Sequence, residues 1–313
     1  MRNEFESSKE SHSHYKHFMS DIPFSPTSTD VSPTESALMT LHLATSEMTK
    51  VLKEIRKNNR ILIQPLQDVV FPAVQMMSSE PGIFNLVLQL GQKDDYTSQH
   101  SIAVAILSLK LGRALNLSFQ DQTDLLQGAV LHDIGKLRIP DEILNKPTSL
   151  THAEYEEMKR HTVYGYELIE RTGAAPEVQA RIALEHHERL NGSGYPYNKK
   201  DDEIHPLSKI VAVIDSFHAM SSMRVYRDQI PFYEILVKLH HDMFGMFDPL
   251  VTLTFLRMMM NELVGTQVEL SNGERGRIKV ISPQAPTLPM IEVGQTVIDL
   301  AQSTGIKIVR IVE

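Results

Sequence analysis

The stretch LLQGAVLHDIGK at Leu125–Lys136 is an apolar helical run that ends in a histidine, an aspartate and a lysine, and it decides the fold. Its helical periodicity carries His132 inward on the apolar face. Burying His132, Asp133 and Lys136 together without a counter-ion would be costly in free energy. A cation held by His132 and Asp133, with an anionic substrate near Lys136, would remove that conflict. The stretch therefore predicts a buried cation site on a helical scaffold.

Further histidines and acids lie at inward-facing or terminal positions of the neighbouring predicted helices. His100, for example, shares a stripe with Val104, Leu107 and Leu111 on a helix that begins near Thr97. Taken alone, each such side chain is better explained as a hydrogen-bonded core residue. Seven of them on five successive helical segments strain that explanation. The seven candidate metal ligands are His100, His132, Asp133, His161, His186, His187 and Asp215.

This donor set indicates two metal ions with open coordination positions. Five imidazoles and two carboxylates exceed the four ligands of a closed zinc site. Nitrogen and oxygen donors without sulfur suit iron, manganese or zinc. Two divalent ions about 3.5–4 Å apart form a clamp for in-line displacement at phosphorus, in which a bridging hydroxide attacks. The predicted chemistry is phosphoester hydrolysis, with Asp133 and Lys136 as catalytic residues and Lys136 stabilising the anionic phosphate.

Composition excludes several other classes of protein. The 313 residues include 39 acidic and 31 basic side chains, and the net charge of −8 leaves no broad positive field for coating DNA. The absence of cysteine excludes disulfides, thiolate zinc sites, iron–sulfur clusters and thiol nucleophiles. The sequence shows neither a signal-peptide pattern nor about 18 consecutive apolar residues. We therefore expect a cytoplasmic protein without a membrane span.

The patterning divides the chain into four regions and predicts a mainly all-α fold. Residues 1–31 are rich in polar residues and proline and predict a flexible tail. Residues 32–90 predict an N-terminal helical region, whose apolar stripe either packs on the main domain or belongs to a helix that forms a homodimer or transmits a signal. Residues 91–260 predict the helical catalytic domain. Residues 261–313 combine the turn dipeptide Asn272-Gly273 with β-branched runs and predict a small β-rich appendage. The stripe consists of Leu41, Ala44, Met48, Val51 and Ile55.

The motifs resemble those of the HD-GYP family, which are bacterial phosphodiesterases that act in cyclic di-GMP signalling. HDIGK alone indicates only the wider HD superfamily of metal-dependent phosphohydrolases, whereas its combination with HHE and GSGYP is specific. The resemblance is strong over residues 94–227. In chain order the motifs are His100-Ser101, HDIGK (His132–Lys136), KRH (Lys159–His161), HHERLNGSGYP (His186–Pro196) and IDSFHAMSSMRVYR (Ile214–Arg227).

The resemblance implies an HD-domain helical bundle and a binuclear metal centre held by the seven candidate ligands, with Asp133 bridging the ions. Iron or manganese is the implied metal, and zinc stays open. The implied reaction is hydrolysis of cyclic di-GMP to linear pGpG, or onward to GMP. The implied substrate-binding residues are Lys136, Gly194, Tyr195, Pro196, Arg224 and Arg227.

Two departures from the family pattern concern the metal centre. Tyr96 stands where a carboxylate holds a third metal in some members, so we expect two metals, although Asp94 or Asp95 could contribute to a third. His218 replaces the second aspartate of the usual DxxDA, and it either changes the surroundings of the metal or adds a ligand.

Because His218 puts the turnover rate in question, more than one function stays open. The first is an active cyclic di-GMP phosphodiesterase. The second is a weakly active receptor of cyclic di-GMP, or a module whose GYP loop engages a protein such as a diguanylate cyclase. The third is an HD hydrolase with another nucleotide substrate, against which the GYP motif argues.

Overall fold

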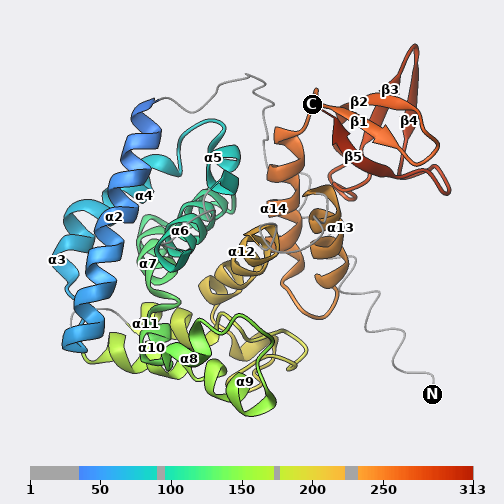
Figure 1. Cartoon of the computed structure of the whole chain (residues 1–313). Helices are drawn as coiled ribbons and strands as arrows, with labels where there is room; N and C mark the ends of the chain where they lie inside the picture. Colours follow the sequence, from blue (N-terminus) through green and yellow to red (C-terminus); the bar gives the residue numbers. More distant parts are fainter. Residues whose placement is uncertain (1–34, 90–95, 173–176, 223–231, 313) are drawn as a thin grey trace, which may run out of the picture.

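The computed structural model describes residues 35–89, 96–172, 177–222 and 232–312, and all structural statements below concern these residues. It confirms the predicted fold class, because the chain is mainly helical and ends in a small antiparallel sheet (Figure 1). The predicted flexible tail, Asp94, Asp95 and the two arginines at 224 and 227 lie outside the described residues.

The helices and strands of the described residues form three groups in chain order. The first are α2 (Glu35–Asn58), α3 (Ile63–Pro65), the π-helical turn η1 (Leu66–Val70), α4 (Phe71–Met77) and α5 (Ile83–Gln89). The central ones are α6 (Tyr96–Ala114), α7 (Phe119–Leu131), the 3-10 turn η2 (Ile134–Arg138), α8 (Asp141–Leu144), α9 (His152–Lys159), α10 (His161–Glu170), α11 (Glu177–Glu185), the 3-10 turn η3 (Asp201–Glu203) and α12 (Pro206–Ser222). The last are α13 (Phe232–Asp242), α14 (Pro249–Glu262), β1 (Gln267–Leu270), β2 (Arg275–Val280), β3 (Met290–Val293), β4 (Thr296–Asp299) and β5 (Ile308–Val312).

Helix α6 forms the centre of the helical body. It contacts α7, α12, α4, α14 and α2, and it is apolar on nearly every side, as expected of a helix enclosed by others. The predicted stripe of His100, Val104, Leu107 and Leu111 is buried. The core of the body therefore surrounds the helix that carries the first candidate ligand. Among the described helices, none combines the length and the apolar character needed to cross a membrane.

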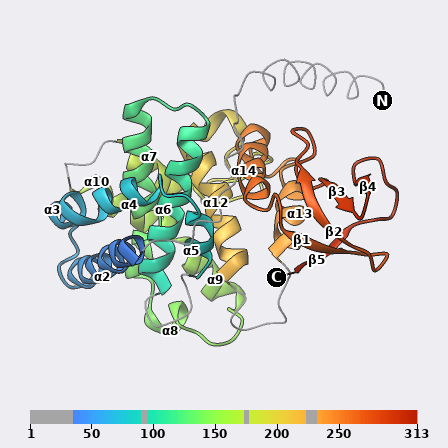
Figure 2. The ribbon, with the colours of Figure 1, turned by 90° about the horizontal axis from the view of Figure 1, so that it is seen from above.

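Helix α2 runs along the side of the helical body that lies away from the sheet (Figures 1 and 2). All residues of its predicted apolar stripe are buried, and the helix packs against η1, α4 and α6. Packing within the chain therefore covers the stripe, as the first interpretation predicts. The apolar side chains that α2 does expose are Leu38, Met39 and Leu43.

Two predicted helices are interrupted where the structure turns a ligand into the core. Helix α7 ends at Leu131 and is followed by η2, so the HDIGK segment is not continuous α-helix. Helix α9 ends at Lys159, and α10 begins at His161. Gly135 allows η2 to approach α10, because a Cβ atom there would lie 1.9 Å from the carbonyl oxygen of His161. The prediction of a continuous helical run from Leu125 to Lys136 is wrong, because the chain leaves the α-helix at Leu131 to let η2 approach α10.

The C-terminal sheet has the strand order β4-β3-β2-β1-β5, and every pairing is antiparallel. The predicted Asn272-Gly273 turn joins β1 to β2, with Gly273 at φ 84°. The sheet contacts the helical body through α13, which packs against β5. Tyr233 of α13 also donates a hydrogen bond to the carbonyl oxygen of Thr287. The appendage therefore sits at the end of the body away from α2.

Candidate metal centre

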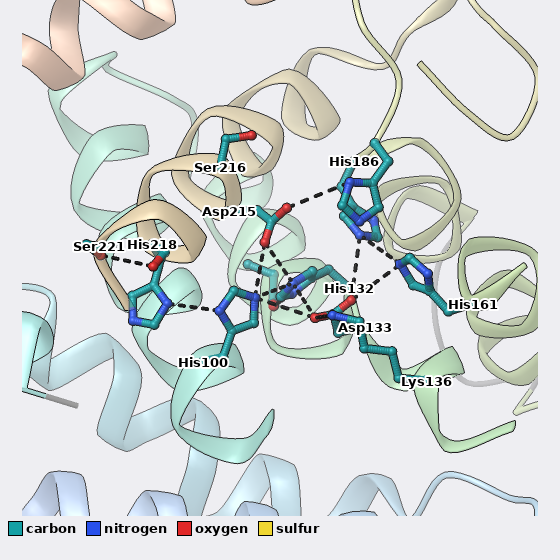
Figure 3. Close-up of polar contacts among 12 residues, drawn as sticks. His100, His132, Asp133, Lys136, His161, His186, Asp215, Ser216, His218 and Ser221 are labelled. Atoms are coloured by element: carbon teal, nitrogen blue, oxygen red, sulfur yellow. Dashed lines mark hydrogen bonds and ion pairs between the residues drawn. The ribbon is translucent and has the colours of Figure 1, made fainter. Parts of the chain in front are cut away.

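All seven predicted ligands converge on one buried site from five helical segments (Figure 3). Asp133, His161, His186 and His187 offer ligand atoms within 4.8 Å of one another, and His100, His132 and Asp215 form a second such group. The two groups meet at the interface of α6, α7, α10, α11 and α12. His100 lies on α6, His132 and Asp133 follow α7, His161 begins α10, His186 and His187 follow α11, and Asp215 lies on α12.

The carboxylate of Asp133 lies between the two groups, with one oxygen toward each. Its Oδ1 is 3.4 Å from His161 Nε2 and 3.8 Å from His186 Nε2. Its Oδ2 is 3.3 Å from His132 Nε2 and 3.5 Å from His100 Nε2. This is the arrangement that a carboxylate bridging two cations requires.

Asp215 provides a second acidic contact across the site. Its Oδ1 is 3.1 Å from His100 Nε2 and 3.9 Å from His132 Nε2, and its Oδ2 is 3.9 Å from His187 Nδ1. Asp215 follows an almost continuous apolar run on α12. The helix therefore buries this acid in the core, next to the imidazoles. The pair of acids is consistent with a site for positive charge.

Backbone carbonyls orient three of the candidate histidine ligands. The Nδ1 atoms of His132, His161 and His186 lie 2.8, 2.7 and 3.0 Å from the carbonyl oxygens of Ala129, Met158 and Ala183. A carbonyl oxygen can only accept, so each Nδ1 carries a proton, and in the neutral form of each ring Nε2 is the atom that offers a lone pair to the site. Metal-binding histidines are commonly oriented by such an outer hydrogen bond.

The protonation of the site also suits a cation. Burial by itself raises the pKa of Asp133, but Lys136 and His132 outweigh it and hold that pKa well below its usual value. Burial and the neighbouring imidazoles lower the pKa values of His186 and His187 far below the usual histidine value. Ionised aspartate and neutral imidazole are the forms that bind metals.

One buried carboxylate oxygen of the site has no hydrogen-bond partner among the described residues. Asp133 Oδ1 is buried and accepts no hydrogen bond from the described residues. Buried carboxylate oxygens rarely lack a hydrogen-bond donor, and a bound cation is one of the standard explanations for such an atom. Together with the oxygen and nitrogen donor set, this atom shows that the residues fit divalent cations.

Lys136 lies at the edge of the site, where it reaches both the acids and solvent. Its Nζ is 2.6 Å from Asp133 Oδ2, and its side chain is 25% exposed. Burial lowers the pKa of Lys136, but Asp133 and Asp215 outweigh this effect and raise the pKa. The ammonium group is therefore charged and accessible to an anion at the mouth of the site.

The predicted GYP loop lies directly over the candidate ligands. The Tyr195 ring stacks on the His187 ring, with centroids 4.6 Å apart and planes at 25°, and its amide donates to the His187 carbonyl. Gly194 allows this approach, because a Cβ atom there would lie 2.4 Å from the same carbonyl oxygen. Pro196 follows through a cis peptide bond. The loop therefore places the aromatic face of Tyr195 beside the candidate metal ligands.

Two glutamates that the sequence analysis missed hold this loop. Glu188 is 2% exposed, and its two oxygens accept hydrogen bonds from the amides of Tyr197 (2.7 Å) and Lys199 (3.0 Å). Glu185 accepts from the Lys199 ammonium group (2.8 Å) and from the amide of His205 (2.8 Å). The sequence contains a pattern that could have predicted this role, because two acids flank the histidine pair just before a glycine-rich loop. The backbone amides of such a loop need hydrogen-bond acceptors.

Lys159 and Tyr96 also lie beside the site, in contacts that the sequence motifs did not predict. The Lys159 ammonium lies 5.9 Å from the centre of the Tyr195 ring and 5.5 Å from that of Tyr155, within cation–π distance of both. Tyr96 stacks on His100, with ring centroids 5.7 Å apart and planes at 19°. Tyr96 therefore packs against the ring of the first candidate ligand.

Comparison with known proteins identifies related sequences and a related fold. The family model described as "HD domain" matches residues 76–251. The chain is 35% identical over 209 residues to the cyclic di-GMP phosphodiesterase of Thermotoga maritima, covering 66% of this chain and 56% of that one. It is 35% identical over 157 residues to 3'3'-cGAMP-specific phosphodiesterase 3 of Vibrio cholerae, covering 50% and 34% of the two chains.

A solved structure shares the architecture. An HDG"Y"P protein from Bdellovibrio bacteriovorus aligns with a TM-score of 0.59 at 19% identity, covering 81% of both chains. At that identity the likeness concerns the fold alone. The chain spans between about a third and just over half of the length of the two curated relatives named above.

Proposed function

The chain belongs to the HD domain family and carries the motifs of its HD-GYP branch, and from this premise we propose that it is a metal-dependent phosphodiesterase that hydrolyses cyclic di-GMP. The observation that carries the proposal is the Asp133 carboxylate, whose two oxygens face two different groups of imidazoles. The names of two curated relatives support a cyclic dinucleotide as substrate.

We propose that the seven convergent histidines and aspartates hold two divalent cations, with Asp133 shared between them. The chemistry supplied by such a pair is activation of water and neutralisation of the charge that develops at phosphorus. Iron and manganese suit the nitrogen and oxygen donors, and zinc suits them as well. Elemental analysis of protein purified without oxygen would identify the metal.

The substrate is proposed to lie between Lys136 and the GYP loop. Lys136 offers a charged donor to a phosphate oxygen, and the face of Tyr195 offers a stacking surface for guanine. Gly194 and Pro196 shape this loop, and Arg224 and Arg227 are assigned to phosphate or guanine on the sequence motif alone. Hydrolysis of one phosphodiester bond gives pGpG, and hydrolysis of the second gives GMP.

The direct test is turnover by the full chain loaded with Fe(II) or Mn(II) without oxygen. Cyclic di-GMP should be converted to pGpG or GMP, and His132→Ala or Asp133→Asn should lower kcat by at least about 100-fold, because each removes a proposed ligand. His241→Ala is the matched control, since that side chain is 89% exposed and far from the acids of the site in sequence. A folded, metal-loaded protein without turnover of any cyclic dinucleotide would refute the proposed activity.

The substitution at position 218 favours a second candidate, a cyclic di-GMP receptor with weak activity. His218 is buried beside His100 within the same centre. Calorimetric binding of cyclic di-GMP with negligible turnover would support the receptor.

A panel that also contains 3'3'-cGAMP would decide whether the substrate resembles that of the Vibrio cholerae relative. The cytoplasmic location, a homodimer and a diguanylate cyclase partner stay predictions.

A further inference from the structure

We infer that His218 is a positioning residue that accepts the hydrogen bond of His100 and thereby fixes His100 in the form that binds a metal. The inference rests on the metal centre of the proposed function. It assigns a role to the one position in the centre where the sequence departs from the family's second aspartate, and it decides between the two roles left open for that position.

His218 lies behind the His100 ring as seen from the other ligands. The two Nδ1 atoms are 2.9 Å apart, and the ring centroids are 4.9 Å apart. The opposite nitrogen of His100, Nε2, lies 3.1 Å from Asp215 Oδ1 and 3.2 Å from His132 Nε2. His218 is also absent from both groups of convergent ligand atoms among the described residues. The His100 ring thus separates Nδ1 of His218 from the centre, which argues against His218 as an additional ligand.

The contact between the two Nδ1 atoms determines where the protons lie. Two ring nitrogens at 2.9 Å share one proton, so one of them donates and the other accepts. A neutral His100 that presents a lone pair on Nε2 carries its proton on Nδ1. His218 must then accept on its own Nδ1 and carry its proton on Nε2. The tautomer of His218 therefore selects the tautomer of His100.

This arrangement differs from the one that orients the other histidines. His132, His161 and His186 donate to backbone carbonyls, which cannot donate in return. His100 instead depends on a side chain that can act in either sense. The imidazole also places no negative charge behind the ring, whereas a carboxylate at the same position would make His100 a more basic ligand. We therefore expect His218→Asp to bind metal more tightly than the wild type.

The experiment compares variants that keep or remove the acceptor. His218→Asn retains an oxygen able to accept from His100, and His218→Leu removes the acceptor at similar volume. Ser221→Ala is the matched control on the same helix, because its hydroxyl donates to the backbone carbonyl of His218 and not to the imidazole. The readout is calorimetric binding of Mn²⁺ to the full chain without substrate, together with ¹⁵N NMR of the imidazoles in the Zn²⁺-loaded protein.

The expected result is about a 10–100-fold weaker Mn²⁺ affinity for His218→Leu, near wild-type affinity for His218→Asn and Ser221→Ala, and tighter binding for His218→Asp. The NMR spectrum should show His100 protonated on Nδ1. Equal affinity of the Leu variant and the wild type would overturn the inference, and so would equal losses in the Leu and Asn variants. If the Leu variant does not fold, an Asn variant that loses affinity overturns it. Failure of the wild type to bind any divalent metal would instead refute the metal centre itself.

Discussion

The buried acids around the site differ in the groups that surround their carboxylates. One kind accepts hydrogen bonds from fixed donors, and the other faces imidazole nitrogens. Glu185 and Glu188 accept hydrogen bonds from backbone amides and from a lysine or a serine, so fixed donors satisfy them. Asp133 and Asp215 face imidazole nitrogens, several of which present lone pairs. Lys136 offsets part of the charge of Asp133, and a positively charged ligand between the two aspartates would give the rest of the arrangement favourable electrostatics. The two aspartates are therefore the acids whose mutation should change metal binding.

At the same scale, Glu188→Gln should loosen the GYP loop while leaving the metal centre intact. The amide nitrogen of glutamine cannot accept, so one of the two loop amides at Tyr197 and Lys199 loses its partner. We expect KM for cyclic di-GMP to rise about 3–10-fold with unchanged metal content, since about 1 kcal/mol of loop order is lost. Glu203→Gln, an exposed capping glutamate, is the control. Loss of metal in the Glu188 variant would contradict this assignment.

Glu154 provides a prediction of pH dependence away from the centre. Its hydrogen bonds from Lys146 and from the amide of Thr151 lower its pKa to about 2. Because the folded-state pKa lies below the unfolded value of about 4.5, the ionised group stabilises the fold above pH 4.5 and this contribution is lost as the pH falls toward 2. NMR titration of the carboxyl carbon should show the low midpoint.

A variant checks the cause of that shift. In Lys146→Met the midpoint of Glu154 should move up toward 4.5, because the largest contribution to the low pKa is removed. Lys50→Met is a suitable control, since Lys50 pairs with Glu47 on a different helix. An unchanged midpoint in Lys146→Met would show that the capping box alone holds the carboxylate ionised.

At the scale of elements, the close contact of η2 with α10 sets the position of two candidate ligands relative to each other. Gly135→Ala would place a Cβ atom 1.9 Å from the carbonyl oxygen of His161 and 2.4 Å from the amide nitrogen of Gly165. Backbone atoms cannot yield without moving α10, so we expect a loss of about 2–4 kcal/mol in unfolding free energy and weaker metal binding. Chemical denaturation and calorimetry measure the two effects.

Gly128→Ala is the matched control for this prediction. The added Cβ atom would meet Ile182 Cδ1 at 2.3 Å, which is the end of a flexible side chain and can rotate away. The variant should therefore lose less stability than Gly135→Ala and retain its metal affinity. If both variants behaved alike, the effect would belong to helix packing in general and not to the HDIGK turn.

For the whole molecule, the centre joins five helical segments that are distant in sequence, so metal binding should stabilise the entire helical body. Ligand that binds only the folded state at 100 times its Kd adds about 2.7 kcal/mol. For a chain of this size that corresponds to a Tm increase of roughly 5 °C. Thermal unfolding with Mn²⁺ and with a chelator should show this difference, and Asp133→Asn should abolish it. A chelator-insensitive Tm in protein shown to hold metal would contradict the prediction.

Much of this organisation was predictable from local pattern. The buried stripe of α2 and the Asn272-Gly273 hairpin depend on residues close together in sequence, and both are confirmed. The helix breaks after Leu131 and Lys159 were not predicted. They depend on the contact of η2 with α10, which brings together residues about 26 positions apart and has no local signature.

The sequence by itself determined which side chains could bind a metal, because inward-facing imidazoles and carboxylates follow from helical periodicity and from motif order. Only the tertiary structure decided how these side chains are arranged into two groups of candidate ligands. It placed one oxygen of Asp133 toward each group of histidines, set Glu188 under the GYP loop, and put His218 behind His100. The physical reason is that periodicity specifies the direction of a side chain relative to its own helix, whereas distances between ligands depend on how separate helices pack.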